Sequence, residues 1–176
     1  MRDEMFCDTD IEPTNILKYL YAKSQEDYTY YMSPAVPPVL RSDITGSLRD
    51  YLSNFINIPI ADVGFLKTLP NSFYPIHKDC FRITALNMLM TQPSEECITS
   101  VYKIDKNPLS NKKIKVPYQK DKFVILDVMS FHSVENKSST ITRLLLSIGI
   151  KTHSFSQVLD IYRSGKLFNL NLQYEA

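Results

Sequence analysis

The sequence predicts a mainly β protein with flanking helices, of the α+β class. Between residues 59 and 150, short runs rich in β-branched and aromatic residues alternate with polar loops, as antiparallel strands do. Helical spacing of apolar residues is confined to the two ends of the chain. With 176 residues, the chain has the length of one ordinary domain. We therefore expect a single unit whose β core is a sandwich or a closed barrel covered by helices.

This pattern divides the domain, residues 1–176, into three parts. Residues 1–58 would form a helical and extended support, residues 59–150 the β core, and residues 151–176 a C-terminal helix and tail. Strand-like composition within the core is found in residues 61–69, 73–79, 82–90, 97–104, 113–118, 122–128 and 142–150.

The N-terminal part should contain two helices. The first is expected near residues 15–24, with Thr14 or Asn15 as its N-cap. The second follows Ser42 or Asp43 as N-cap, and its apolar face consists of Ile44, Leu48, Leu52, Phe55 and Ile56. Proline cannot donate to a sheet ladder, so an extended or edge segment is expected between the helices, at Pro34, Pro37 and Pro38.

The C-terminal helix has clear signals at both ends. Ser154 or Ser156 can cap its N-terminus, and Gly165 can end it.

Composition excludes several classes of function. The net charge of +1 gives no support for binding a phosphate backbone, and the four glycines form no nucleotide-binding loop. The sequence has neither an apolar run of membrane-spanning length nor the apolar region of a secretory signal at its start. The three cysteines have no CxxC spacing and are expected to be reduced thiols. These features predict a cytoplasmic protein without a membrane or nucleic-acid partner.

Four residues suggest chemistry. His77 and Asp79 are separated by one residue, so in a strand they share a side, about 6.6 Å apart along the chain. His132 follows the apolar strand 123–128 and is expected in a polar turn where that strand leaves the core. Arg143 opens an apolar strand and needs an anionic partner, from the protein or from a ligand. Two imidazoles and a carboxylate can bind Fe(II) and leave three positions open, while a guanidinium fork suits a carboxylate.

Simpler interpretations of these residues remain open. His77 and Asp79 can be a loop histidine and a solvated carboxylate. Arg143 can form a structural ion pair with Glu135 or Asp127. The last histidine, His153, is expected at the surface or at a helix cap. A zinc site that uses Cys80 and Cys97 lacks the usual spacing.

The ordered set His77-x-Asp79, His132 and Arg143 resembles the HxD…H…R signature of the 2-oxoglutarate and Fe(II)-dependent oxygenase superfamily. The likeness is greatest to small members from phage and marine microbes, which also carry a Leu-Asn pair after HxD, an H-x-V-x-N motif at the second histidine and a serine four residues after the arginine. Those positions match Leu86, Asn87, Val134, Asn136 and Ser147, and the resemblance covers about residues 60–150.

The resemblance implies a double-stranded β-helix of the jelly-roll, cupin-like kind. Fe(II) would be bound by His77, Asp79 and His132, which would form the catalytic centre, and Arg143 would bind the 5-carboxylate of 2-oxoglutarate. The implied activity uses O₂ to hydroxylate a small molecule or a protein or peptide side chain, and it releases succinate and CO₂. Two alternatives are a jelly-roll protein without turnover and a cupin-like metalloenzyme that does not use 2-oxoglutarate.

One position departs from the superfamily pattern. Several members have a serine or threonine two residues after the arginine, where this chain has Leu145. Ser147 is about 13 Å along a straight strand from Arg143, so we do not expect it to bind the same carboxylate. Tyr74 and Arg82 flank the motif and are candidates for contact with substrate or co-substrate.

Overall fold

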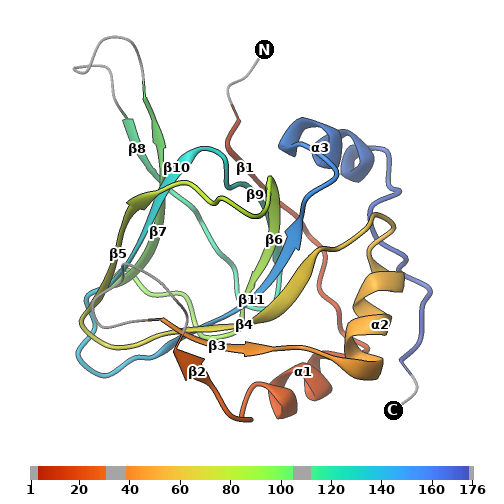
Figure 1. Ribbon diagram of the computed structural model, residues 1–176, viewed down its shortest axis with the longest axis horizontal. Helices are drawn as coiled ribbons and strands as arrows, with labels where there is room; N and C mark the ends of the chain where they lie inside the picture. The colour runs from red at the N-terminus through yellow and green to blue at the C-terminus, as the bar shows by residue number, and fades with distance from the viewer. Residues whose placement is uncertain (1–3, 31–38, 105–111, 175–176) are drawn as a thin grey trace.

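The computed structural model describes residues 4–30, 39–104 and 112–174. Within these residues, two antiparallel sheets face each other, and helices cover the outer side of the larger sheet (Figure 1). Pro34, Pro37 and Pro38, on which the predicted extended segment depends, lie outside the described residues.

The larger sheet has the strand order β1-β9-β6-β11-β4-β3-β2. N-terminal strands occupy both of its edges, because β1 pairs with β9 while β3 and β2 extend the sheet beyond β4. Its strands are β1 (Phe6–Asp8), β2 (Thr29–Tyr30), β3 (Leu40–Asp43), β4 (Asp62–Thr68), β6 (Thr84–Leu89), β9 (Phe123–Asp127) and β11 (Arg143–Ile150).

The smaller sheet has the order β5-β10-β7-β8. Its strands are β5 (Ser72–His77), β7 (Cys97–Lys103), β8 (Lys112–Lys115) and β10 (Phe131–Asn136). From β4 to β11 the chain passes repeatedly between the two sheets, as it does in a double-stranded β-helix. The predicted fold class, mainly antiparallel β with flanking helices and a jelly-roll core, is confirmed.

The two faces of the larger sheet have different surroundings, as the alternate residues of β11 show. Its residues 144, 146, 148 and 150 are buried leucines and isoleucines that pack in the core with the helices. The alternate residues, Arg143, Leu145, Ser147 and Gly149, are on the opposite face of the strand, toward the smaller sheet. Burial of each large side chain on the helical side contributes about 1.5–3 kcal/mol. That layer stabilises the sheet, so the inner face can carry polar groups.

The helices are α1 (Leu17–Lys23), α2 (Gly46–Phe55) and α3 (Phe155–Arg163). The predicted apolar face of the second helix is confirmed, since all five of its positions are buried in the core beneath α2. Ser154 caps α3 in a reciprocal capping box with Gln157, as predicted, while Ser156 is inside the helix. Gly165 follows the end of α3 with a positive φ of 72°, as predicted for a helix stop.

The predicted caps of the first two helices were wrong. Ile16 and Thr45 are the N-caps, and neither side chain makes a capping hydrogen bond. Ser42 and Asp43 instead belong to β3, where they pair with β4. At Ser42 and Asp43, pairing with β4 satisfies the backbone groups that a helix cap would otherwise satisfy.

Each strand-like run of the predicted core contains a strand, but β1, β3 and β10 were not predicted. The omission of β10 matters most, because His132 lies in that strand and not in a polar turn. Its sequence, Phe131–Asn136, has little of the apolar alternation that marks other strands, because His132 lines the cavity and the buried Asn136 donates to backbone carbonyls of neighbouring loops. No helix within the described residues has the length and apolar character needed to cross a membrane.

Candidate metal and co-substrate site

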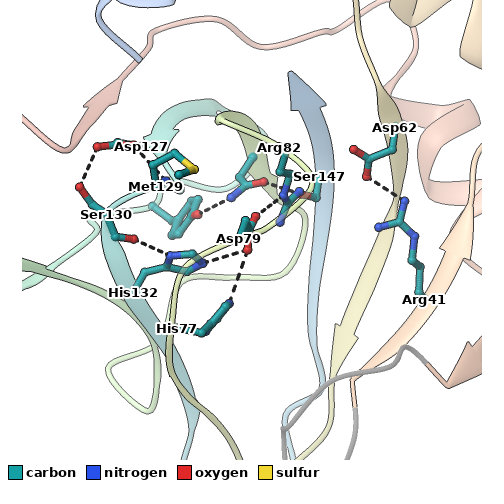
Figure 2. Close-up of polar contacts among 12 residues, drawn as sticks. Arg41, Asp62, His77, Asp79, Arg82, Asp127, Met129, Ser130, His132 and Ser147 are labelled. Carbon is teal, nitrogen blue, oxygen red and sulfur yellow. Dashed lines mark hydrogen bonds and ion pairs between the residues drawn. The ribbon is translucent and has the colours of Figure 1, made fainter. Parts of the chain in front are cut away.

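His77 and His132 lie opposite each other on neighbouring strands of the smaller sheet. His77 ends β5, His132 is the second residue of β10, and the two are directly paired. Paired residues project to the same face, and the ring centroids here are 4.2 Å apart. Asp79 follows β5 by two residues, and its backbone N–H donates to the Val128 carbonyl at 3.0 Å. This bond holds the carboxylate beside the two imidazoles, and Figure 2 shows the three side chains converging.

The three side chains form a compact group of ligand atoms. Asp79 Oδ1 is 3.6 Å from His77 Nε2 and 3.6 Å from His132 Nε2. Among the described residues, this is the group of histidine, cysteine and acidic side chains that could hold a metal ion. One face of an octahedron with bonds of about 2.1 Å has edges of about 3.0 Å, so small side-chain rotations would bring these atoms onto an ion.

Hydrogen bonds to the backbone fix both imidazoles in the same tautomer. His77 Nδ1 is 2.8 Å from the Pro75 carbonyl oxygen, and His132 Nδ1 is 3.0 Å from the Ser130 carbonyl oxygen. A carbonyl only accepts, so each Nδ1 carries the proton, and in the neutral ring Nε2 has a free lone pair. Two lone pairs and a carboxylate oxygen therefore face one another. Such an arrangement needs a cation between the acceptors, either a proton or a metal ion.

The electrostatic environment favours the metal-binding forms of these groups. Burial, followed by repulsion from His132, lowers the pKa of His77 below its usual value. Burial alone would raise the pKa of Asp79, but the adjacent imidazole of His132, when protonated, and the charge of Arg82 outweigh it, and the pKa falls to about 2. At neutral pH, Asp79 is therefore an anion and His77 is neutral.

Arg143 lies at the other end of the same cavity, between the two sheets. His77, Asp79, His132 and Arg143 all line this cavity, and its other walls are largely apolar, formed by residues such as Leu66, Leu126, Val128, Val134 and Leu145. The arginine side chain is only 2% exposed. The structure thus brings together all four residues that the sequence singled out.

The contacts of Arg143 leave it without an acidic partner among the described residues. Its Nη2 donates to Thr99 Oγ1 at 2.8 Å, and its guanidinium lies 5.3 Å from the centroid of the Tyr118 ring. Loss of hydration lowers its pKa, and no carboxylate is near enough to oppose this effect. A buried guanidinium without a counter-ion is costly, so the site is suited to an anionic ligand.

The alternative partners proposed for Arg143 are engaged elsewhere. Glu135 accepts from Lys113 Nζ at 2.6 Å and also pairs with Lys137. Asp127 accepts from Ser130 Oγ at 2.7 Å and from the backbone of Met129. A structural ion pair of Arg143 with either acid is therefore absent from the described residues.

Several residues at the site were missed or left unassigned by the sequence. Thr99 and Tyr118 contact Arg143, and nothing in their local sequence distinguishes them from other residues of a half-buried strand or loop. Ser147 does not approach the carboxylate-binding end, as expected from its distance along the strand. It accepts a hydrogen bond from Arg82 and donates one to Asn87. Since Ser147 lies on the same face of β11 as Arg143, the period-2 pattern could have placed it on the inner face of the sheet.

Comparisons with known proteins agree with the fold. No protein-family model matches the chain. No curated protein sequence matches it either. Solved structures match over most of its length. A 2-oxoglutarate and Fe(II) oxygenase family oxidoreductase from Burkholderia pseudomallei is 8% identical with a TM-score of 0.66, and the match covers 87% of this chain and 88% of that chain.

Two further structures extend this similarity. A prolyl-4-hydroxylase from Pseudomonas putida is 12% identical with a TM-score of 0.65, over 86% of this chain and 95% of that chain. HygX from Streptomyces hygroscopicus, solved with nickel, 2-oxoglutarate and hygromycin B bound, is 11% identical with a TM-score of 0.57, over 85% of this chain and 84% of that chain. This chain has the fold of the 2-oxoglutarate and Fe(II)-dependent oxygenases. Identities this low establish the fold and not the activity.

Proposed function

We propose that this protein is a non-haem Fe(II)- and 2-oxoglutarate-dependent oxygenase that hydroxylates a small molecule or a protein or peptide side chain. One observation carries the proposal. A single cavity contains, at one end, three acceptor atoms that need a cation and, at the other end, a buried guanidinium that needs an anion. Fe(II) would supply the cation at the first end, and a carboxylate of 2-oxoglutarate would supply the anion at the second.

The donor set fits Fe(II). Nε2 of His77, Nε2 of His132 and Oδ1 of Asp79 would bind three positions on one side of the ion, and the other three would remain open. The backbone carbonyls of Pro75 and Ser130 would hold the imidazoles in the required tautomer. When bound, the iron and its co-substrate would activate O₂ and release succinate and CO₂.

The spacing of the polar groups fits 2-oxoglutarate. Thr99, which contacts Arg143, and Val101, which pairs with His132, are two residues apart on the same face of β7. That separation is about 6.8 Å. A five-carbon chain spans about 5 Å between its end carbons when each bond is about 1.5 Å. Arg143 can therefore bind the distal carboxylate. The ring of Tyr118 lies beside Arg143, and its hydroxyl would be a further donor to the same carboxylate.

A groove outside the cavity is the expected position for the substrate. His77, Asp79 and Tyr74 line both the cavity and this groove, and Lys78 and Phe81 line the groove. A molecule in the groove would thus approach the metal from the solvent side.

The described cysteines are free thiols, which supports our expectation of a reducing, cytoplasmic location.

Anaerobic spectroscopy tests the proposal before any substrate is known. Fe(II) with 2-oxoglutarate should give a weak visible charge-transfer band, and His132→Ala should abolish it. His153→Ala is the matched control, because this histidine contacts Thr152 and is not among the grouped ligands. Under air, the wild-type protein should release succinate from 2-oxoglutarate, and free amino acids and peptides can be screened for faster release.

Three outcomes would contradict the proposal. A folded wild-type protein without the band would exclude this iron and co-substrate site. Metal binding that does not respond to 2-oxoglutarate would favour a cupin-like metalloenzyme. A band without succinate, for every substrate screened, would favour a jelly-roll binding protein without turnover.

A further inference from the structure

Arg82 makes two hydrogen bonds that point in different directions. Its Nε donates to Oδ2 of Asp79, and its Nη1 donates to Ser147 Oγ at 2.6 Å. The other carboxylate oxygen of Asp79, Oδ1, faces the two imidazoles. Arg82 therefore occupies one oxygen of the carboxylate and leaves the other directed to the metal position, as Figure 2 shows.

The far end of Arg82 is hydrogen-bonded to the inner strands of the larger sheet. Ser147 Oγ donates to Asn87 Oδ1 at 2.7 Å, and the amide of Asn87 donates to the Tyr118 hydroxyl at 3.3 Å. Ser147 and Asn87 are directly paired on the central strands β11 and β6, and both are buried. A hydrogen-bonded series thus connects Asp79 with the ring that lies beside Arg143.

The next residue on this face of β11 provides space for Arg82. Gly149 is two residues after Ser147, and a Cβ at that position would lie 3.1 Å from Cδ of Arg82. It would also lie 1.9 Å from Oδ1 of Asp62, so any side chain there would force rearrangement. Two successive inner positions of β11 therefore accommodate the arginine, one by accepting its hydrogen bond and the other by leaving room.

The contact between Arg82 and Asp79 would affect how many coordination positions of the metal ion remain open. In an octahedron, three protein atoms and a co-substrate that binds through two oxygens leave one position for O₂. A carboxylate that coordinated through both oxygens would fill that position. Without Arg82, Oδ2 would be a buried anionic oxygen without a partner, and the metal ion would be the nearest cation.

We propose that Arg82 is a positioning residue that restricts Asp79 to a single coordinating oxygen and so keeps one metal position open. This inference rests on the proposed oxygenase function. It assigns Arg82 to the metal centre, because its Nε and Nη1 both donate to groups inside the protein, one of them a carboxylate oxygen of Asp79.

Nitric oxide, which binds Fe(II) where O₂ would, tests the proposal independently of turnover. Arg82→Met removes the charge and the hydrogen bonds. Arg82→Lys keeps the charge but loses the planar fork that reaches Asp79 and Ser147 together, and Ser147→Ala leaves Arg82 in place but removes its second acceptor. Each variant is loaded anaerobically with Fe(II) and 2-oxoglutarate, and nitric oxide is titrated while the iron–nitrosyl EPR signal is recorded. Arg163→Met is the matched control, since Arg163 pairs with Glu4 and not with a ligand residue.

The expected result is an intact 2-oxoglutarate band with a nitric oxide affinity lowered at least about tenfold in Arg82→Met. Arg82→Lys and Ser147→Ala should give smaller losses, and the control none. Wild-type nitric oxide affinity in all three variants would overturn the inference. Loss of the band in all three would overturn it too, because Arg82 would then be needed to form the site. A wild-type protein without the band would instead remove the proposed function itself.

Discussion

Replacement of Arg143 by methionine should change stability and co-substrate binding in opposite directions. The guanidinium is 2% exposed and has no acidic partner among the described residues. A buried ionic group often costs more than an apolar side chain of similar volume, while the loss of the Thr99 contact opposes part of the gain. We expect Arg143→Met to stabilise the metal-free protein by about 1 kcal/mol, which corresponds to about 2–4 °C in Tm for a chain of this size.

The same substitution should strongly weaken binding of 2-oxoglutarate. Truncation of one member of a buried, hydrogen-bonded charge pair costs about 2–5 kcal/mol. A value near 3 kcal/mol corresponds to a roughly 100-fold increase in Kd. Calorimetric titration of 2-oxoglutarate into the Ni(II)-loaded protein measures this effect, and thermal unfolding with a chelator present measures the stability.

Arg41→Met provides the control. Arg41 Nε is 2.6 Å from Asp43 Oδ1, and its Nη2 is 3.0 Å from Asp62 Oδ2. Loss of these partly exposed ion pairs should lower stability by about 1 kcal/mol and leave 2-oxoglutarate affinity unchanged. The reasoning about Arg143 is refuted if Arg143→Met behaves as Arg41→Met is expected to, losing stability but not affinity.

Three other substitutions should act on stability alone, with 2-oxoglutarate affinity unchanged. Lys113 lowers the pKa of Glu135, so the stability contributed by Glu135 should be complete above its ordinary pKa and should be lost as the pH falls through the lowered pKa. Glu135→Gln should cost under about 1 kcal/mol at pH 7 and progressively less as the solution is made more acidic, measured by urea unfolding. Ser154→Ala removes the capping box and should cost about 1 kcal/mol by the same assay. Leu52→Ala creates a cavity beneath α2 and should cost about 2–5 kcal/mol. The predicted order of stability is contradicted if Glu135→Gln costs more than Leu52→Ala. The prediction that these residues act on stability alone is contradicted if any of the three variants binds 2-oxoglutarate less tightly than the wild-type protein.

The sequence was sufficient to predict the sheet-rich core, because the composition of its strands is dominated by local preferences. It also singled out four residues that the structure places around one cavity, since two of only three histidines occur there in the order HxD…H…R. The sequence did not predict which side chains contact these site residues. Arg82 and Ser147 are 65 residues apart in the chain, and their contact exists only because β11 pairs with β6 in one register.

The errors have a common physical origin. Polar residues near Ser42 satisfied the rules for a helix cap, yet strand pairing with β4 satisfied the same backbone groups more completely. The strand that carries His132 has a polar sequence, because His132 lines the cavity and Asn136 donates to backbone carbonyls of neighbouring loops. Local patterns therefore failed where the molecule places functional groups in regular structure.

The most direct test of the account is a crystal structure grown anaerobically with Mn(II) and 2-oxoglutarate, with the ion located by its anomalous scattering. The account predicts one ion bound by Nε2 of His77, Nε2 of His132 and a single oxygen of Asp79, with the distal carboxylate of 2-oxoglutarate on Arg143. An ion bound elsewhere, or a co-substrate carboxylate that does not contact Arg143, would contradict it.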